Sequence, residues 1–204
     1  MSKLQLDLKK NPVVAILRGL QKHDASQIAD VLVEFGVRIL EIPLNREGAL
    51  EALLQIKKTH GELALIGAGT VTSFEALGMV ADADVDFCLA PNLNEAIVFK
   101  AQELGLSFVP GAFTPSEVFR ASELGCEIVK IFPFDQFGYS AARALLQVLP
   151  EHTKLLAVGG LKIDDLGEAL ENGLAGVGVG SSLFRAGMTS TELRTYLESK
   201  AGAR

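Results

Sequence analysis

The chain has 204 residues and a formal net charge of −6, with 19 Lys and Arg against 25 Asp and Glu. At 49% hydrophobic and 22% charged residues, its composition is that of a globular domain. The mild acidity gives no reason to expect nucleic acid or an anionic membrane as a partner. We expect one domain over residues 1–204, without a membrane-spanning run or a secretory signal peptide.

Short apolar runs rich in Val, Ile and Leu alternate with longer amphipathic stretches along the whole chain. The predicted strands begin near Val13, Val37, Leu63, Val85, Leu106, Glu127, Leu155 and Gly176. Their starts are 21 to 28 residues apart, which fits one strand, one helix and two short loops per unit. The stretches between them, such as residues 25–33, repeat their apolar residues at a period near 3.6 and are predicted helices.

Local signals mark where the predicted helices begin and end. Helix-start signals follow the strands at Thr72-Ser73, at Thr114-Pro115-Ser116-Glu117, and at Asp164 or Asp165. Glycines that end helices stand at Gly36, Gly61, Gly105, Gly125 and Gly173. Two further helices, Leu4–Lys10 and Thr191–Lys200, are expected to flank the repeated units.

Eight strands that are apolar on both faces indicate a parallel sheet covered by helices. Eight near-equal units without an inserted domain favour an α/β fold, specifically a (β/α)8 TIM barrel with a short N-terminal helix and a C-terminal helix. An open doubly wound sheet is the alternative that the same alternation permits.

Charged residues in the predicted strands fall into two groups. Arg38, Asp84, Asp86, Glu127 and Lys154 lie at strand beginnings, the end of a barrel associated with stability. Three others lie toward the opposite end: Arg18 after the first strand, Glu41 in the second and Lys130 in the sixth. Because the second and sixth strands face each other across an eight-stranded barrel, we expect Glu41 and Lys130 to meet in its lumen.

The pair Glu41 and Lys130 suggests covalent chemistry. Burial among Ile128, Ile131 and Phe132 lowers the pKa of a lysine, and a neutral amine can attack a ketone to form a Schiff base. A nearby carboxyl group of raised pKa can carry the protons. Glu41 and Lys130 thus fit the active site of a metal-free aldolase. The alternative is that they form a buried salt bridge with a purely structural role. For Arg18, the alternative to a role in the site is an arginine at the rim that only faces solvent.

Glycine-rich segments end the seventh and eighth strands, at Gly159-Gly160 and at Gly176–Ser182. Barrels often bind phosphate at these two places, on backbone amides and a short helix N-terminus, although tight turns also use glycine. Neither segment completes Gly-x-Gly-x-x-Gly, so no dinucleotide site is expected. Thr70, Pro91-Asn92 and Pro110-Gly111 end the third to fifth strands and either line the cavity or form ordinary loops.

Histidines and cysteines do not suggest a metal site or a disulfide framework. His23, His60 and His152 lie in separate units, so no histidine-bound metal is expected, while carboxylate-bound Mg²⁺ stays open. Cys88 and Cys126 form no Cys-x-x-Cys pair, which favours two buried apolar residues and a cytoplasmic protein.

Five ordered segments carry a resemblance to a known family. They are residues 15–19 (AILRG), 41–45 (EIPLN), 66–71 (IGAGTV), 130–133 (KIFP) and 157–160 (AVGG). From about Pro12 to Ala186 the chain resembles the class I 2-keto-3-deoxy-6-phosphogluconate aldolase family, and within it the 2-dehydro-3-deoxy-6-phosphogalactonate aldolase branch. The resemblance implies a homotrimer of barrels that reversibly cleaves a phosphorylated keto sugar acid to pyruvate and D-glyceraldehyde 3-phosphate.

The resemblance also implies a role for each matching residue. Lys130 would form the covalent imine, with no other cofactor and no metal, and Glu41 would be the general acid and base. Arg18 and Thr70 would hold the pyruvyl carboxylate, while Phe132 and Pro91 would shape the pocket. The implied phosphate cradle consists of Gly159, Gly160, Gly180 and Ser181.

Several positions bear on the branch. Val158 and Asn45 favour the galactonate branch, because the gluconate branch commonly has threonine at the first position and in some members arginine at the second. Residues 112–117 look like some gluconate-branch members, and residues 134–139 depart from the galactonate pattern. The alternatives are thus a 2-dehydro-3-deoxy-6-phosphogluconate aldolase, with or without activity on 4-hydroxy-2-oxoglutarate, and more remotely a phosphosugar isomerase or epimerase, or a non-catalytic phosphometabolite-binding barrel.

Overall fold

The computed structural model describes residues 2–201, and within them nine strand segments form one parallel sheet. The strands are β1 (Val13–Ile16), β2 (Ile39–Pro43), β3 (Leu65–Gly69), β4 (Phe87–Leu89), β5 (Phe108–Val109), β6 (Gly111–Ala112), β7 (Ile128–Ile131), β8 (Lys154–Val158) and β9 (Gly176–Val179). They are hydrogen-bonded in the order β5-β4-β3-β2-β1-β9-β8-β7-β6. The predicted strand starts therefore agree with the structure to within two residues.

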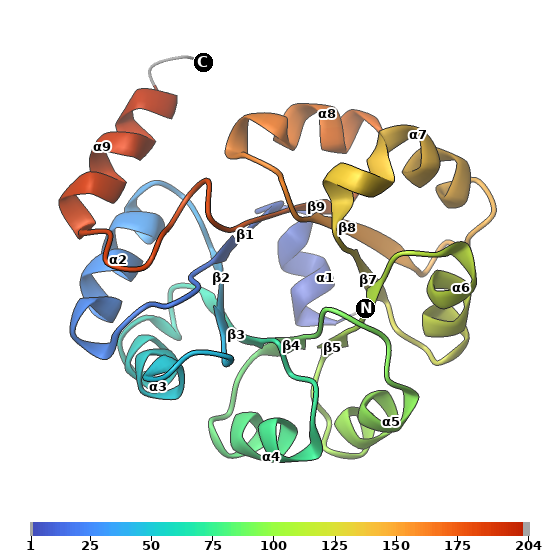
Figure 1. Cartoon of the computed structure of the whole chain (residues 1–204), viewed down its shortest axis with the longest axis horizontal. Helices are drawn as coiled ribbons and strands as arrows, with labels where there is room; N and C mark the ends of the chain where they lie inside the picture. The colour runs from blue at the N-terminus through green and yellow to red at the C-terminus, as the bar shows by residue number, and fades with distance from the viewer. Residues whose placement is uncertain (1, 202–204) are drawn as a thin grey trace.

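The two ends of this sheet are consecutive in the chain, separated by Pro110 alone. β5 pairs with β4, and β6 pairs with β7, while the Pro110 carbonyl accepts a hydrogen bond from the Lys130 backbone N–H at 2.9 Å. β5 and β6 are thus two halves of the fifth barrel strand, interrupted at a residue that has no N–H to donate. The sheet curls into the predicted eight-stranded barrel (Figure 1), and the open doubly wound alternative is wrong.

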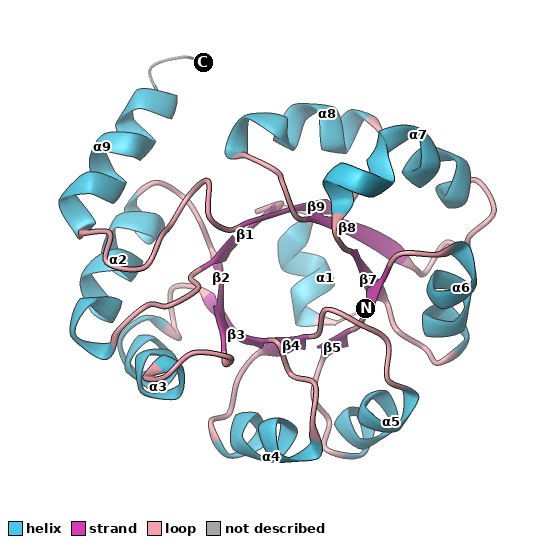
Figure 2. Cartoon of the chain, viewed as in Figure 1, coloured by secondary structure: helices cyan, strands magenta, loops and turns pink. Residues whose placement is uncertain are grey.

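Helices alternate with the strands and form an outer ring around the barrel (Figure 2). The helices are α1 (Lys3–Leu8), α2 (Lys22–Glu34), α3 (Ala49–His60), α4 (Phe74–Asp82), α5 (Glu95–Glu103), α6 (Pro115–Glu123), α7 (Phe134–Leu146), the 3₁₀ helix η1 (Ile163–Asp165), α8 (Leu166–Glu171) and α9 (Ser190–Ala201). The expected N- and C-terminal helices are present as α1 and α9. No helix in residues 2–201 is both long and apolar enough to cross a membrane.

The predicted helix-start signals act as caps. The Ser73 hydroxyl accepts a hydrogen bond from the backbone N–H of Ala76, and Thr114 and Glu117 form a reciprocal capping box at the start of α6. Of the glycines expected to end helices, Gly36, Gly105, Gly125 and Gly173 adopt positive φ values of 70° to 85°. Gly61 does not, because the chain leaves α3 through right-handed turns in which Leu63 and Ala64 both donate to the His60 carbonyl.

Successive residues of each strand face opposite sides of the sheet and pack in two separate cores. The outward-facing residues, such as Ala15, Leu40 and Val129, pack under the helices. The lumen-facing residues pack against one another and against Leu4 and Leu8 of α1, which is seen inside the ring of strands in Figure 1. The lumen core consists of Val14, Ile16, Ile39, Leu65, Phe87, Leu89, Val109, Ile128, Leu156 and Val158, together with the two leucines of α1.

This alternation directs the predicted site residues inward. Glu41 follows the lumen-facing Ile39 by two residues, and Lys130 follows the lumen-facing Ile128 by two residues. In the sheet order, β2 and β7 are separated by three strands, β1, β9 and β8. They therefore stand on opposite sides of the barrel, as the sequence predicts.

Charges at the strand beginnings tie helices to the bottom of the barrel. Asp86 accepts hydrogen bonds from the Ile66 backbone N–H at 2.8 Å and from the ammonium groups of Lys3 and Lys57, both at 3.0 Å. The Ser2 backbone N–H donates to Glu127 at 2.6 Å. These residues are structural, as expected. Cys88 and Cys126 are buried free thiols, as expected.

Helix α1 offers a matched test of the lumen core. Leu4 is 1% exposed, whereas Leu6 on the same helix is 51% exposed. We expect Leu4→Ala to lower the free energy of unfolding by about 2–5 kcal/mol, because it leaves a cavity in the lumen core, and Leu6→Ala to change it by less than about 0.5 kcal/mol. Chemical denaturation followed by circular dichroism measures both, and equal losses would contradict the packing described for α1.

Candidate active site

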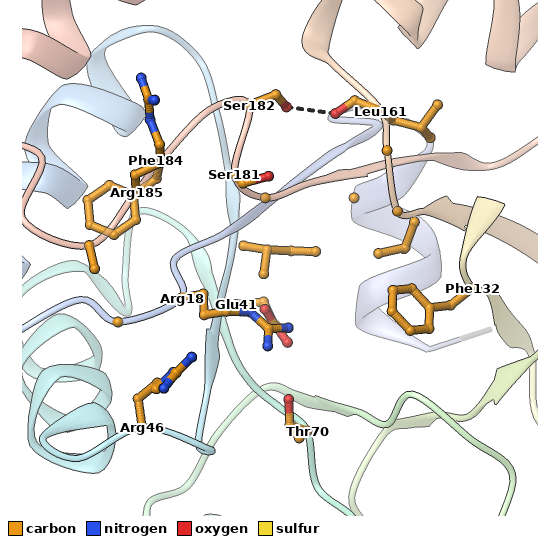
Figure 3. A pocket seen from close by; sticks show the side chains of 18 of the residues that line it. Arg18, Glu41, Arg46, Thr70, Phe132, Leu161, Ser181, Ser182, Phe184 and Arg185 are labelled. Carbon is orange, nitrogen blue, oxygen red and sulfur yellow. Dashed lines mark hydrogen bonds between the residues drawn. The ribbon is translucent and has the colours of Figure 1, made fainter. Parts of the chain in front are cut away.

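A cavity of about 750 Å³ opens at the carboxyl ends of the strands. Nine of the ten predicted site residues line it (Figure 3 shows its side chains). They are Arg18, Glu41, Thr70, Lys130, Phe132, Gly159, Gly160, Gly180 and Ser181. The tenth, Pro91, is not among the lining residues; its backbone lies against Gly111, where an added Cβ would be 2.4 Å from the Pro91 carbonyl oxygen.

Glu41 is a carboxyl group in an environment that disfavours its charge. It is 2% exposed, and its Oε2 atom has no hydrogen-bond partner among the described residues. Burial raises the pKa of Glu41 to about 7, against the opposing influence of the positive charges of Lys130 and Arg18. A carboxyl group with a pKa near 7 can both donate and accept a proton at neutral pH.

Lys130 is a buried amine on the opposite wall. It is 8% exposed, and its Nζ lies 4.6 Å from the centroid of the Phe132 ring. Burial lowers the pKa of Lys130 below its ordinary value; the charge of Arg18 lowers it further and that of Glu41 opposes the change. A lower pKa enlarges the fraction of neutral amine, the form that attacks a carbonyl carbon.

The two groups share the cavity without joining. Among the described residues, no carboxylate oxygen lies within 4.0 Å of the Lys130 Nζ. The described residues thus do not form the ion pair that the structural alternative assumes, and the roles of Glu41 and Lys130 stay a prediction. The charge of each group acts on the pKa of the other at a distance, and both side chains are free to contact a molecule bound in the cavity.

Arg18 and Thr70 stand at the rim of the cavity. Arg18 is exposed, as the solvent-facing alternative requires, yet it lines the cavity, and Figure 3 shows its guanidinium group directed toward Glu41. Thr70 follows β3 with a φ of 59°, a left-handed conformation that is unusual for a β-branched residue. Such conformations concentrate at functional sites, where surrounding structure holds them.

The structure explains why glycine is needed at some positions of the cavity wall but not at others. Gly159 and Gly160 have φ values of 107° and 75°, and an added Cβ at Gly160 would lie 2.5 Å from the Cβ of Asp135. Turn geometry and packing therefore account for both. Neither turn geometry nor packing requires glycine at position 180, because its φ is not positive and an added Cβ would meet only Ile16, at 3.9 Å. Its lack of a side chain keeps the wall open beside Ser181.

Sequence reasoning missed other polar residues of the cavity. Arg46 and Arg185 line it from the loops after β2 and β9, and Gln21 lines it from the loop after β1. The Ser182 hydroxyl donates to the Leu161 carbonyl at 2.7 Å and ties together the loops after β9 and β8 (Figure 3). Neither arginine lies in a predicted strand; the signal that marks both is their position in loops at the carboxyl ends of the strands.

Metal ligands do not converge in the part of the chain that the structure describes. No group of three or more His, Cys, Asp or Glu residues in residues 2–201 is placed to hold a metal ion. His60 instead bonds to Asp30 at 2.9 Å and to Thr59 at 2.8 Å, joining α3 to α2.

The raised pKa of Glu41 predicts how its replacement affects stability. Folded and unfolded chains both hold the proton below about pH 4.5, but between about pH 4.5 and 7 only the folded protein keeps it. The wild-type protein therefore loses stability relative to Glu41→Gln as the pH rises through this window, by up to roughly 3 kcal/mol. Urea unfolding at a series of pH values measures the difference, with the exposed Glu62→Gln as control. A difference that does not vary with pH would refute the prediction.

Comparisons with known proteins agree with this geometry. The family model of KDPG and KHG aldolase matches residues 4–198. The 2-dehydro-3-deoxy-6-phosphogalactonate aldolase of Escherichia coli (strain K12) is 36% identical over 180 residues, 88% of each chain. The 2-dehydro-3-deoxy-phosphogluconate aldolase of Treponema pallidum (strain Nichols) is 29% identical, over 79% of this chain and 76% of its own. A solved structure described as native KDPGal matches with a TM-score of 0.89 and 34% identity, over 95% of this chain and 94% of its own. The chain therefore belongs to the KDPG and KHG aldolase family of lyases.

Proposed function

We propose that the protein is a class I aldolase that reversibly cleaves 2-dehydro-3-deoxy-6-phosphogalactonate to pyruvate and D-glyceraldehyde 3-phosphate, with Lys130 as the imine-forming residue. The observation that carries the proposal is the pairing, in one cavity, of a lysine of lowered pKa with a glutamic acid of raised pKa. These are the two groups that imine chemistry requires.

Imine formation begins at the amine. The lone pair of the neutral Lys130 Nζ attacks C2 of the substrate ketone, the resulting carbinolamine takes a proton on its oxygen, and water leaves. Glu41 supplies that proton, since its pKa near 7 leaves part of its population protonated at neutral pH. The Phe132 ring beside Nζ favours the positive charge of the protonated imine through a cation–π contact.

Cleavage follows from the same two groups. The ionised Glu41 takes the proton of the C4 hydroxyl, the C3–C4 bond breaks, and its electron pair moves into the imine to give an enamine and the aldehyde. Protonation of C3 then gives the imine of pyruvate, which water hydrolyses to free Lys130. The imine is the electron sink, so the proposed reaction needs no metal and no organic cofactor.

The ends of the substrate are assigned to the cavity walls. Arg18 and Thr70 would hold the carboxylate, because the guanidinium group forms charge-assisted hydrogen bonds and lies on the Glu41 side of the cavity. Gly159, Gly160, Gly180 and Ser181 would cradle the phosphate. Gly180 supports this assignment, since neither backbone conformation nor packing requires a glycine there, whereas a ligand approaching the backbone does. A role of Pro91 in shaping the pocket stays a prediction.

The choice between the two epimeric substrates rests on one wall of the cavity. Val158 ends β8 and lines the cavity, and its side chain offers no hydrogen bond to a substrate hydroxyl. Relatives named for each epimer match this chain, with higher identity for the galactonate enzyme. The galactonate substrate is therefore our proposal and the gluconate substrate its alternative. A single domain over residues 1–204, a homotrimeric assembly and a cytoplasmic location also stay predictions.

Trapping the imine tests the proposed mechanism. We expect borohydride with pyruvate to add the mass of one reduced pyruvyl group to the protein, and peptide mass spectrometry to locate it on Lys130. Lys130→Met should prevent the addition, whereas Lys154→Met, at the opposite end of the barrel, should not. An adduct on another lysine, or none in the wild-type protein, would refute the proposal.

Coupled pyruvate assays with the two epimers test the substrate. We expect a higher kcat/KM for 2-dehydro-3-deoxy-6-phosphogalactonate than for its gluconate epimer. Val158→Thr should move the ratio toward the gluconate epimer by about tenfold, the worth of one neutral hydrogen bond. A wild-type preference for the gluconate epimer would replace the proposed substrate by its alternative.

A further inference from the structure

Strand β3 carries no side chain at the place where the carboxyl group of Glu41 lies. A Cβ added to Gly69 would be 1.3 Å from the Glu41 Oε1 and 2.3 Å from its Cδ, so the carboxyl group occupies the volume that any larger residue would fill. Glu41 pairs in register with Gly67, and Gly69 pairs with Pro43. The side chain of Glu41 therefore leans along the barrel wall toward the carboxyl end of β3.

Backbone conformation does not explain Gly69. Its φ is not in the left-handed region, so alanine would fit the backbone of β3 at that position. Gly67, two residues earlier on the same face, shows the same kind of vacancy, filled there by the ring of Phe87, 2.2 Å from an added Cβ. Both glycines make room for a neighbour, but only at Gly69 is that neighbour a titratable group.

The vacancy accounts for several properties of the carboxyl group together. Resting against bare backbone, it is 2% exposed, and it stays farther than 4.0 Å from the Lys130 Nζ although the two share a cavity. The charged groups that act on it are Lys130 from β7 and Arg18 from the loop after β1. A methyl group at position 69 would push the carboxyl group out of the wall into the cavity, where these two charges and water are nearer.

We propose that Gly69 is a positioning residue for Glu41: the missing side chain on β3 forms a slot that holds the carboxyl group in the barrel wall, apart from Lys130. The inference rests on the proposed function in one respect, the use of Glu41 for proton transfer. The slot itself is a packing feature, and its test can be separated from the test of the reaction.

Gly69→Ala tests the slot in the full-length protein. We expect kcat for cleavage to fall by about 10²-fold, as for a displaced general acid and base, with KM changed by less than about threefold because the substitution replaces none of the proposed binding groups. The acidic limb of the kcat–pH profile should move to lower pH, since the displaced carboxyl group is more hydrated and nearer to positive charge. Gly78→Ala, in α4 with no atom within 4 Å of the added Cβ, is the matched control and should match the wild type.

A double-mutant cycle separates positioning from general damage. In a Glu41→Gln background the proton transfer is already lost, so adding Gly69→Ala should lower kcat by less than about twofold further. A loss of the same factor in both backgrounds, an unshifted pH profile, or a Gly69→Ala enzyme with wild-type kcat would overturn the proposal.

A stability cycle keeps the test open if Gly69→Ala folds poorly. Glu41→Ala removes the carboxyl group that the new methyl would strike, so the drop in Tm caused by Gly69→Ala should disappear in the Glu41→Ala background. An equal drop in both backgrounds would overturn the slot. Failure of the proposed function is seen separately, as a wild-type protein that traps no pyruvate, and the stability cycle does not depend on it.

Discussion

The active site depends on one constraint, the removal of two opposite charges from water inside a closed barrel. Burial disfavours the charged forms of both Glu41 and Lys130, which raises one pKa and lowers the other. A direct ion pair would cancel these changes, since each charge would stabilise the other. The barrel places the pair on opposite sides of its lumen, so that burial favours the uncharged form of each group, whereas in water both would be ionised.

The alternation of side chains along the strands connects the fold to this constraint. The parity that places Ile39 and Ile128 in the lumen core also places Glu41 and Lys130 above them, on strands that the barrel sets opposite each other. The same face of β3 carries Gly67 and Gly69, whose vacancies admit the Phe87 ring and the Glu41 carboxyl group. A single register therefore determines the floor of the cavity, its reactive groups and the room they occupy.

Sequence reasoning reached much of this structure because strands and charges leave strong local signals. The repeat of apolar runs predicted eight barrel strands, and three charges near the carboxyl ends of strands led to Arg18, Glu41 and Lys130. Three features lay beyond it. The interruption of the fifth strand at Pro110 depends on pairing with both neighbouring strands. Arg46 and Arg185 stand in loops at the carboxyl ends of the strands, where the sequence shows the loop but not which of its side chains lines the cavity. The role of Gly69 appears only when the side chain of another strand is placed beside it.

Helix α1 closes the lumen from below, where Leu4 and Leu8 pack against the inward-facing residues of the strands. The lumen core and α1 thus lie beneath the cavity, which opens at the carboxyl ends of the strands. In the proposed reaction, a substrate that fills the cavity excludes water, and the final hydrolysis needs water to return after the aldehyde leaves. Replacing water by a bound molecule strengthens the effect of burial on the Glu41 carboxyl group, and the negative charges of the proposed substrate act in the same direction on its pKa. In the proposed reaction, an occupied cavity would therefore favour the protonated form of Glu41, and the return of water would favour its ionised form.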